Sequence, residues 1–395
     1  MEFDVIIIGA GPAGLFCSYK IKNKKVLILE KNEKPGKKLL ITGGGKCNFT
    51  NIDDIKELYT HYGEKKNFVK RALYNYSNKD LLNEVDFEYI ITDDGKAFPK
   101  SMESKTVLNW LLEKNNKKNV EIKYNIEIHN IDKTEKFMVN TNKGKYTSKF
   151  LILATGGKSY PVLGSNGDGY KFAKNFGHNI VKPKPALTPI IIKDFPFKDL
   201  SGNSMNVIIR KEKKIFKGNL LFTHKGFSGP VILNSSRYFN DGDNITVSFV
   251  NIDNEEKFKS DFLELLNKNK NEFLFDALKR YNLTKRFIAI MFKRLDLKRN
   301  KKCNNVSKEE RSKIINYLFK QSFVIERVGD FNIAIVTLGG VDTKEIDSKT
   351  MESKLVENLY FIGEVLDVDG DTGGYNIQWA FSSAKAASDN INKII

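Results

Sequence analysis

The first thirty residues constrain the fold of this chain more than any other stretch. An apolar run at residues 4–8 has the character of a buried strand, a helical pattern follows to about residue 21, and a second apolar run at residues 25–29 ends on Glu30. The loop between the first strand and the helix has the spacing G-x-G-x-x-G and consists of Gly9, Ala10, Gly11, Pro12, Ala13 and Gly14. This strand–helix–strand order predicts a dinucleotide site; the alternative is a tight turn that binds no ligand.

Each residue type in this loop suits a pyrophosphate. Gly9 permits a sharp turn, Gly11 lets the ligand approach the backbone, and Gly14 lets the helix pack closely on the strand. The helix begins with a proline, which needs no N–H partner, and its N-terminus offers N–H groups and partial positive charge to phosphates. The carboxylate of Glu30 can accept hydrogen bonds from a ribose diol and would repel a 2′-phosphate. We therefore do not expect the bound adenosine to be that of NADP.

A second glycine-rich segment follows at residues 43–48. Gly43, Gly44 and Gly45 would let the backbone lie against a flat ligand, and Lys46 could meet a phosphate or the electron-rich edge of a flavin. Cys47 has no second cysteine nearby, so we do not expect the dithiol mechanism of two-cysteine flavin reductases. A small packed thiol beside the cofactor is favoured over a nucleophile.

Two later strand ends carry residues that a flavin nucleotide requires. A buried strand at residues 150–153 ends in the small-residue turn 154–157, which allows close passage of a cofactor. Another strand, at residues 358–362, ends on Gly363 and Glu364, and this acid could hold a ribitol hydroxyl, which FAD has and NAD lacks. The segment 373–376 then opens a helix whose N–H groups could stabilise the anionic reduced flavin. We therefore predict FAD as the cofactor.

The middle of the chain has a different pattern. Prolines 183, 185 and 189 mark a boundary, residues 190–250 are rich in strands and indicate a small barrel or sandwich, and residues 255 to about 323 have helical spacing. His224 lies there between turn residues; as a proton donor to substrate it is a tentative catalytic residue, and a structural histidine is the favoured alternative. The three other histidines are separately placed and suggest no metal site.

Composition narrows the remaining choices. The 395 residues include three scattered cysteines, no apolar run long enough for a membrane span and no secretory signal, so we expect a cytoplasmic protein without a membrane partner. The formal net charge is +17, and its densest cluster lies at residues 293–302. Lysines spread over solvated faces are the favoured interpretation of this charge, and a nucleic-acid partner is the less favoured one.

Together these motifs resemble a bacterial FAD-dependent oxidoreductase family, BaiN-like or YhiN-like, also labelled NAD(P)/FAD-dependent oxidoreductase or aminoacetone-oxidase-family FAD-binding enzyme. The matching stretches run in order from the first glycine loop, through 43–51, 154–169, 222–230 and 337–341, to 363–376. Two residues depart from the family pattern, because Lys46 stands where we expect Arg and Ala384 where Gly is usual. A lysine there would contact phosphate as a point charge rather than through a bidentate fork.

The resemblance implies an α/β fold with a glutathione-reductase-type Rossmann FAD-binding domain built from both chain ends, residues 1–189 and 324–395. Inserted between them would be a β-barrel at 190–254, completed by strands near 320–335, and a helical subdomain at 255–323. A strand near the adenine makes Ile128 a candidate for backbone contact. The complete predicted FAD site is Gly9, Ala10, Gly11, Pro12, Ala13, Gly14, Glu30, Lys31, Lys37, Lys38, Gly43, Gly44, Gly45, Lys46, Cys47, Asn48, Ile128, Ala154, Thr155, Gly156, Gly157, Gly363, Glu364, Asp367, Gly373, Gly374, Tyr375 and Asn376.

The resemblance also implies a reaction in which a hydride passes through flavin N5. We favour an NAD(P)H-dependent reductase of a small, enone-like organic substrate, with NADH or NADPH docking transiently as the electron donor. The alternatives are an amine oxidase that uses dioxygen, an RNA-acting or RNA-binding flavoprotein, and a non-catalytic flavin sensor.

Overall fold

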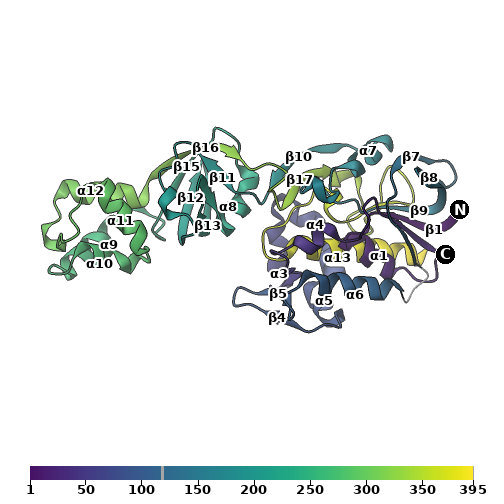
Figure 1. The fold of residues 1–395 in the computed structure, drawn as a ribbon, viewed down its shortest axis with the longest axis horizontal. Coiled ribbons are helices and arrows are strands. Elements are labelled where there is room, and N and C mark those ends of the chain that lie inside the picture. The colour runs from purple at the N-terminus through teal and green to yellow at the C-terminus, as the bar shows by residue number, and fades with distance from the viewer. Residues whose placement is uncertain (117–119, 395) are drawn as a thin grey trace. The chain divides into compact units, whose positions relative to one another are not determined.

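The computed structural model describes residues 1–116 and 120–394. These residues form two compact units, one of residues 1–186 with 330–395 and the other of residues 187–329. Figure 1 shows that the first unit contains both chain ends. The four-part division of the chain stays a prediction.

The first unit is organised around a seven-stranded sheet. Its strands lie in the order β6-β2-β1-β9-β8-β7, and β18 also pairs with β9. β1 pairs in parallel with β2 and β9, and Leu153 at the end of β9 is in register with both Ile8 and Phe361, so the carboxyl ends of β1, β9 and β18 meet at one edge. Ligands of parallel sheets bind at such an edge. The strands are β1 (Glu2–Ile8), β2 (Val26–Leu29), β6 (Val120–Lys123), β7 (Ile128–Lys133), β8 (Phe137–Thr141), β9 (Gly144–Leu153) and β18 (Leu359–Phe361).

Two helices from opposite chain ends pack against each other in this unit (Figure 1). α1 (Pro12–Lys20) and α13 (Tyr375–Lys393) bury Phe16 and Phe381 with ring centroids 4.9 Å apart. α1 is short and its fold depends on this packing, since nine residues alone do not make a stable helix. The other helices are α2 (Lys37–Ile41), α3 (Ile55–Leu58), α4 (Lys66–Asn75), α5 (Asn78–Glu84), α6 (Ser104–Asn116) and α7 (Asp168–Asn175).

Two smaller sheets complete the first unit. Pro183 and Pro185, expected to mark a domain boundary, lie in the second half of the strand β10, and the unit ends with this strand at Ala186. β10 belongs to a sheet of only two strands and its register shifts between Val181 and Lys184, so the missing proline N–H groups are tolerated. The strands are β3 (Thr50–Asn51), β4 (Tyr89–Ile91) and β5 (Lys96–Pro99) in one sheet, and β10 (Ile180–Ala186) and β17 (Val336–Val341) in the other.

The second unit is built on a closed six-stranded barrel in the order β11-β14-β13-β12-β15-β16. β16 pairs with both β15 and β11 and closes the barrel, whose interior holds the buried rings of Phe197, Phe222 and Phe227. A barrel has no exposed edge strand that could pair with another chain. The elements are β11 (Ile190–Ile192), β12 (Ser204–Lys211), β13 (Lys214–Phe222), β14 (Gly226–Ser228), α8 (Pro230–Ser235), β15 (Asn244–Ser248) and β16 (Gln321–Val328).

A helical insertion connects β15 to β16. Its helices are α9 (Glu255–Lys268), α10 (Leu274–Ala277), α11 (Lys285–Arg294) and α12 (Lys308–Phe319), and β16 begins at Gln321, before the expected end of the helical part. The predicted fold class, a Rossmann FAD-binding domain from both chain ends with an inserted barrel and helices, is confirmed. No helix within the described ranges is both long and apolar enough to cross a membrane.

Candidate cofactor site

The loop at residues 9–14 connects β1 to α1 and is packed as tightly as its glycines predict. Gly9 has a φ of +106°, and a Cβ on it would lie 2.6 Å from the carbonyl oxygen of Ala154. A Cβ on Gly14 would lie 2.1 Å from the carbonyl oxygen of Gly9. At Gly11, in contrast, a Cβ would have no atom within 4 Å. Internal packing therefore explains why residues 9 and 14 are glycines, whereas Gly11 borders open space.

The N-terminus of α1 faces this space with its N–H groups uncapped. Gly11 is the N-cap residue, no side chain caps the helix, and its first turn contains no acidic residue. An uncapped N-terminus leaves backbone donors and a partial positive charge for an anion. These features fit a pyrophosphate at the place that the sequence predicts.

Glu30 lies buried immediately after β2, beside the glycine loop. Its Oε2 accepts a hydrogen bond of 2.8 Å from the N–H of Ala10, and its Oε1 accepts one of 2.8 Å from the N–H of Asn32. The N–H of Ile126 donates to the Glu30 carbonyl oxygen at 3.0 Å, which brings the chain before Ile128 to the same place. The Asn32 side-chain amide also donates to Oε1 at 2.8 Å, so Oε1 accepts two bonds and Oε2 accepts one. The remaining acceptor site on Oε2 leaves Glu30 able to hold a ribose hydroxyl.

We predict that Glu30→Ala weakens FAD binding by about 10- to 100-fold, since hydrogen bonds to a charged group contribute about 1.5–3 kcal/mol. The dissociation constant can be measured from flavin fluorescence after removal and return of the cofactor. Glu33→Ala is the matched control, because the Glu33 side chain is 65% exposed and only approaches Lys37 at 4.0 Å. Equal affinities of the two variants would contradict the ribose role.

A second group of predicted residues surrounds Glu364, just after β18. Lys38 Nζ lies 2.7 Å from Glu364 Oε2, and the N–H of Thr337 donates to Glu364 Oε1 at 2.9 Å. A Cβ on Gly157 would lie 2.4 Å from Thr337 Oγ1, and one on Gly363 would lie 3.1 Å from the Ala13 side chain. The turn after β9, the end of β18 and the start of α1 therefore meet, as a cofactor that spans both chain ends requires.

The third group joins the 43–51 segment to the N-terminus of α13. A Cβ on Gly374 would lie 2.6 Å from the carbonyl oxygen of Thr50, and Asn51 Nδ2 donates to the carbonyl oxygen of Gly373 at 3.3 Å. α13 has no side-chain cap and no acid in its first turn. Asn48 Oδ1 is buried without a hydrogen-bond partner in the described parts of the chain, so it fits a ligand with a ring N–H, such as the pyrimidine ring of a flavin.

Cys47 is buried in this segment, and burial raises the pKa of its thiol to about 12. A thiol with such a pKa stays protonated near neutral pH and is a poor nucleophile. The pKa therefore supports the interpretation of Cys47 as a small packed side chain.

His61 is a residue that the sequence did not single out. Its ring stacks on Tyr375 with centroids 4.1 Å apart, its Nδ1 lies 3.0 Å from Asp371 Oδ2, and its Nε2 lies 3.4 Å from Asp53 Oδ2. The Tyr375 hydroxyl donates to the same Asp53 oxygen at 2.6 Å. The His61 side chain is 32% exposed. A partly exposed imidazole thus lies beside the predicted pyrimidine end of the flavin site.

Several predicted residues have other partners or lie elsewhere. Lys31 Nζ pairs with Asp168 at 2.9 Å, Asp367 pairs with Lys65, and the Asn376 side chain bonds the backbone of Gly370. Lys46 is exposed. His224 is exposed on the β13–β14 turn of the other unit. His129 and His178 lie apart from the site, and no group of metal-binding side chains is found in the described ranges.

Three features of the described site fit FAD: the uncapped α1 N-terminus beside open space, a carboxylate at each of two strand ends (Glu30 buried and Glu364 partly buried), and the unpartnered Asn48 oxygen. With the Rossmann topology they define an FAD-dependent oxidoreductase. The chain belongs to the HI0933-like family, because the family model described as "HI0933-like protein Rossmann domain" matches residues 3–390.

Relatives align over nearly the whole chain. The ribosomal RNA dihydrouridine synthase of Escherichia coli strain K12 is 33% identical over 400 residues, covering 99% of this chain and 98% of that protein. The protein of the same description from Haemophilus influenzae is also 33% identical, over 98% of both chains. The 3-dehydro-bile acid delta(4,6)-reductase of Clostridium scindens is 27% identical, over 96% of this chain and 97% of that one.

Solved structures share the fold. An open flavocytochrome c3 fumarate reductase superposes with a TM-score of 0.54 at 16% identity, over 99% of this chain and 78% of that one. The 3-ketosteroid delta1-dehydrogenase of Sterolibacterium denitrificans gives a TM-score of 0.54 at 12% identity, over the full length of both chains.

Proposed function

We propose that this protein reduces the C5=C6 double bond of uridine in ribosomal RNA to give dihydrouridine. The observation that carries this proposal is the 33% identity, over 99% of the chain, to a ribosomal RNA dihydrouridine synthase. The names of that relative and of the bile acid reductase describe one chemistry, because each implies addition of two hydrogens to a C=C bond conjugated to a carbonyl. The enone-like substrate that the family resemblance implied is of the same chemical class.

The charge of the chain favours RNA over a small steroid. The second unit, residues 187–329, contains 28 Lys and Arg against 16 Asp and Glu, so it carries +12 of the net +17 in 143 of 395 residues. Phosphate groups are the partners that such a concentration of positive charge attracts. A bile acid offers one carboxylate and would not require it.

The residues of the first unit would hold the cofactor and supply the proton. The loop 9–14, Glu30, Glu364 and the α13 N-terminus would bind FAD, which supplies a hydride to the carbon farther from the carbonyl. The carbon next to the carbonyl then needs a proton. We assign that proton to His61, since its Nδ1 is fixed by Asp371 at 3.0 Å and its Nε2 has only the longer 3.4 Å approach to Asp53. NADH or NADPH would reduce the flavin.

The test combines a flavin assay and an RNA assay. The purified protein is mixed anaerobically with NADH or NADPH, and we expect the yellow colour to bleach with one of them. Addition of protein-free ribosomal RNA should restore the colour, and nucleoside mass spectrometry should find dihydrouridine. Glu30→Ala protein from which FAD has been removed serves as the control without flavin. Reoxidation by a steroid enone but not by RNA would overturn the RNA assignment and favour a small-molecule reductase.

A further inference from the structure

The helix α11 presents an exposed surface that is rich in Lys and Arg. Phe287, Ile288, Met291 and Phe292 point into the core of the second unit. The opposite arc consists of Lys285, Arg286, Ala289, Ile290, Lys293 and Arg294, with no acidic residue among them. We define the α11 basic face as Lys285, Arg286 and Lys293, whose side chains are exposed and make no hydrogen bond or close ion pair with a described residue; Lys285 has only a longer-range attraction to Asp276.

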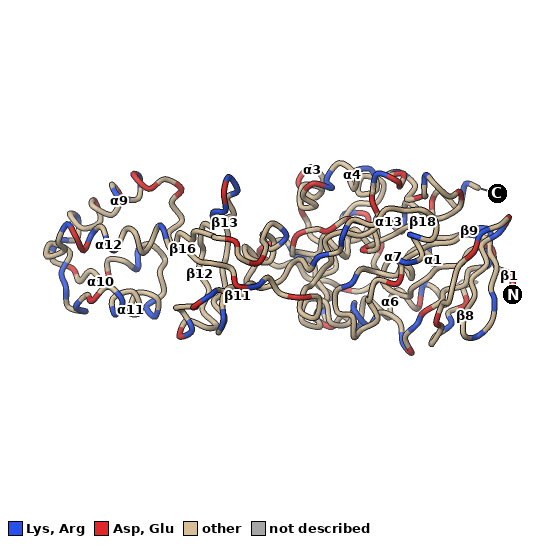
Figure 2. The backbone as a smooth tube through the Cα atoms, turned by 90° about the horizontal axis from the view of Figure 1, so that it is seen from above, with Lys and Arg blue, Asp and Glu red and all other residues tan. Residues whose placement is uncertain are grey.

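Acidic residues pair with several, but not all, of the lysines on and beside the neighbouring helices α9 and α12. On α9, Lys259 pairs with Glu256 at 2.7 Å and with Glu255 at 3.2 Å, and Lys268 pairs with Glu264. Lys301 pairs with Glu310 of α12. Residues 285–302, in contrast, contain eight Lys and Arg and one acid, Asp296. The excess positive charge of the helical insertion is therefore concentrated on α11 and the loop that follows it, whose Lys and Arg are blue in Figure 2.

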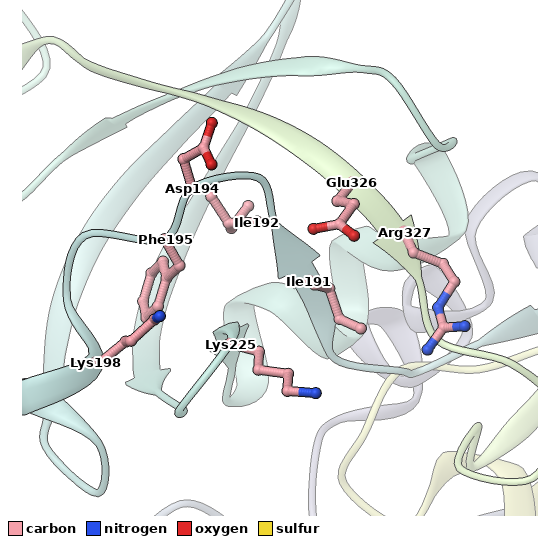
Figure 3. Close-up of a pocket in the computed structure, with 8 residues that line it drawn as sticks. All are labelled: Ile191, Ile192, Asp194, Phe195, Lys198, Lys225, Glu326 and Arg327. Atoms are coloured by element: carbon pink, nitrogen blue, oxygen red, sulfur yellow. The ribbon is translucent and has the colours of Figure 1, made fainter.

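The last arginine of α11 connects this face to a pocket of the barrel. Arg294 donates to the carbonyl oxygen of Pro196 at 2.7 Å, and its guanidinium lies 5.4 Å from the centre of the Phe197 ring. The same loop forms one wall of a pocket of about 540 Å³. Figure 3 shows its cations Lys198, Lys225 and Arg327, together with Asp194 and Glu326, around the strands β11 and β16.

We propose that the α11 basic face binds the phosphate backbone of the RNA substrate and leads it toward this pocket. The proposal rests on the proposed function for the identity of the RNA. Unpaired Lys and Arg along one helix face suit a row of phosphates, and contacts of this kind position a nucleic acid without reading its sequence. A membrane surface is a poorer partner, because a helix that inserts into lipid needs an exposed apolar face, and that of α11 is buried.

The test reverses charge on this face and, separately, on α9. The α11 variant combines Arg286→Glu with Lys293→Glu, at two exposed positions seven residues apart. The α9 variant combines Lys257→Glu with Lys270→Glu. It changes the net charge by the same amount at one exposed residue in α9 and one just after it. We expect the α11 variant to bind protein-free ribosomal RNA at least about tenfold more weakly, with the slope of log K against log salt reduced by about 1–2. FAD content, the reductive bleaching and the melting temperature should stay at wild-type values in both variants.

Two results would overturn the proposal. One is equal RNA affinity of the α11 and α9 variants, whether both fall or neither does. The other is loss by the α11 variant of binding to anionic phosphatidylglycerol vesicles with RNA binding intact. The RNA-binding measurement is separate from the reaction. The wild-type protein could form no dihydrouridine while, of the two variants, only the α11 variant loses RNA binding. That result would refute the proposed function but still support the α11 basic face as an RNA-binding surface.

Discussion

Replacing Gly14 with alanine is expected to yield a protein that holds no FAD and melts at a lower temperature. The new Cβ would lie 2.1 Å from the Gly9 carbonyl oxygen and 3.3 Å from Ile7 Cγ2, so α1 must move away from β1. Overpacking of this kind costs about 1–3 kcal/mol, and here the atoms that must yield belong to the phosphate loop itself. The flavin absorbance of the purified variant and its thermal unfolding curve measure both effects.

Gly11→Ala separates binding from folding at the same loop. Gly11 has a φ of −80° and a Cβ there would meet no atom within 4 Å, so the fold accepts alanine without strain. If the open space is where the pyrophosphate approaches the backbone, this variant should keep the wild-type stability of the cofactor-free protein and bind FAD at least about tenfold more weakly, a loss of about 1.4 kcal/mol. Wild-type FAD affinity in Gly11→Ala would place the pyrophosphate elsewhere.

The second large effect is expected at His61. His61→Asn should lower the rate of uridine reduction by about 10²- to 10⁴-fold, the usual contribution of a positioned proton donor. FAD content and the rate of bleaching by the nicotinamide donor should not change, because neither step needs this proton. A single-turnover measurement, in which the pre-reduced protein is mixed with RNA, isolates the affected step.

Two other histidines make the His61 result specific. His129 is exposed on β7 and its replacement by Asn should have no effect. His224→Gln tests the proton donor that the sequence suggested. If His224→Gln loses uridine reduction while His61→Asn stays active, His224 of the barrel is the proton donor. A loss of FAD from His61→Asn would instead show that the ring supports the cofactor site.

The sequence revealed the parts of this protein that are encoded locally. The β1–α1–β2 opening could be predicted because its strands, glycines and terminal acid all lie within thirty residues. The strand-rich pattern of residues 190–250 indicated a small barrel or sandwich, and the family resemblance favoured the barrel. Pro183 and Pro185 did not reveal that they lie within a strand, because proline is disfavoured inside a large sheet but is tolerated in the two-stranded pair β10–β17.

His61 shows why the site could not be completed from sequence. Its two carboxylate partners are Asp53, eight residues away, and Asp371, 310 residues away, and its stacking partner Tyr375 opens the last helix. No local spacing links these residues, and the histidine lies in a short 3₁₀ turn without a motif. The unequal distribution of positive charge was visible in the sequence. Whether it forms a binding surface could not be predicted, because this depends on which lysines the fold leaves without an acidic partner.

The union of both chain ends in one cofactor site has a consequence for biosynthesis. The loop at residues 9–14 is synthesised early, yet Gly363 and α13, which pack against Ala13 and α1, are synthesised much later. A nascent chain therefore carries half of a nucleotide site for most of its synthesis, while the barrel and its helical insertion, residues 187–329, are already available to fold. Acquisition of the yellow cofactor would then require that synthesis has passed α13, and it would separate such molecules from chains truncated before this helix.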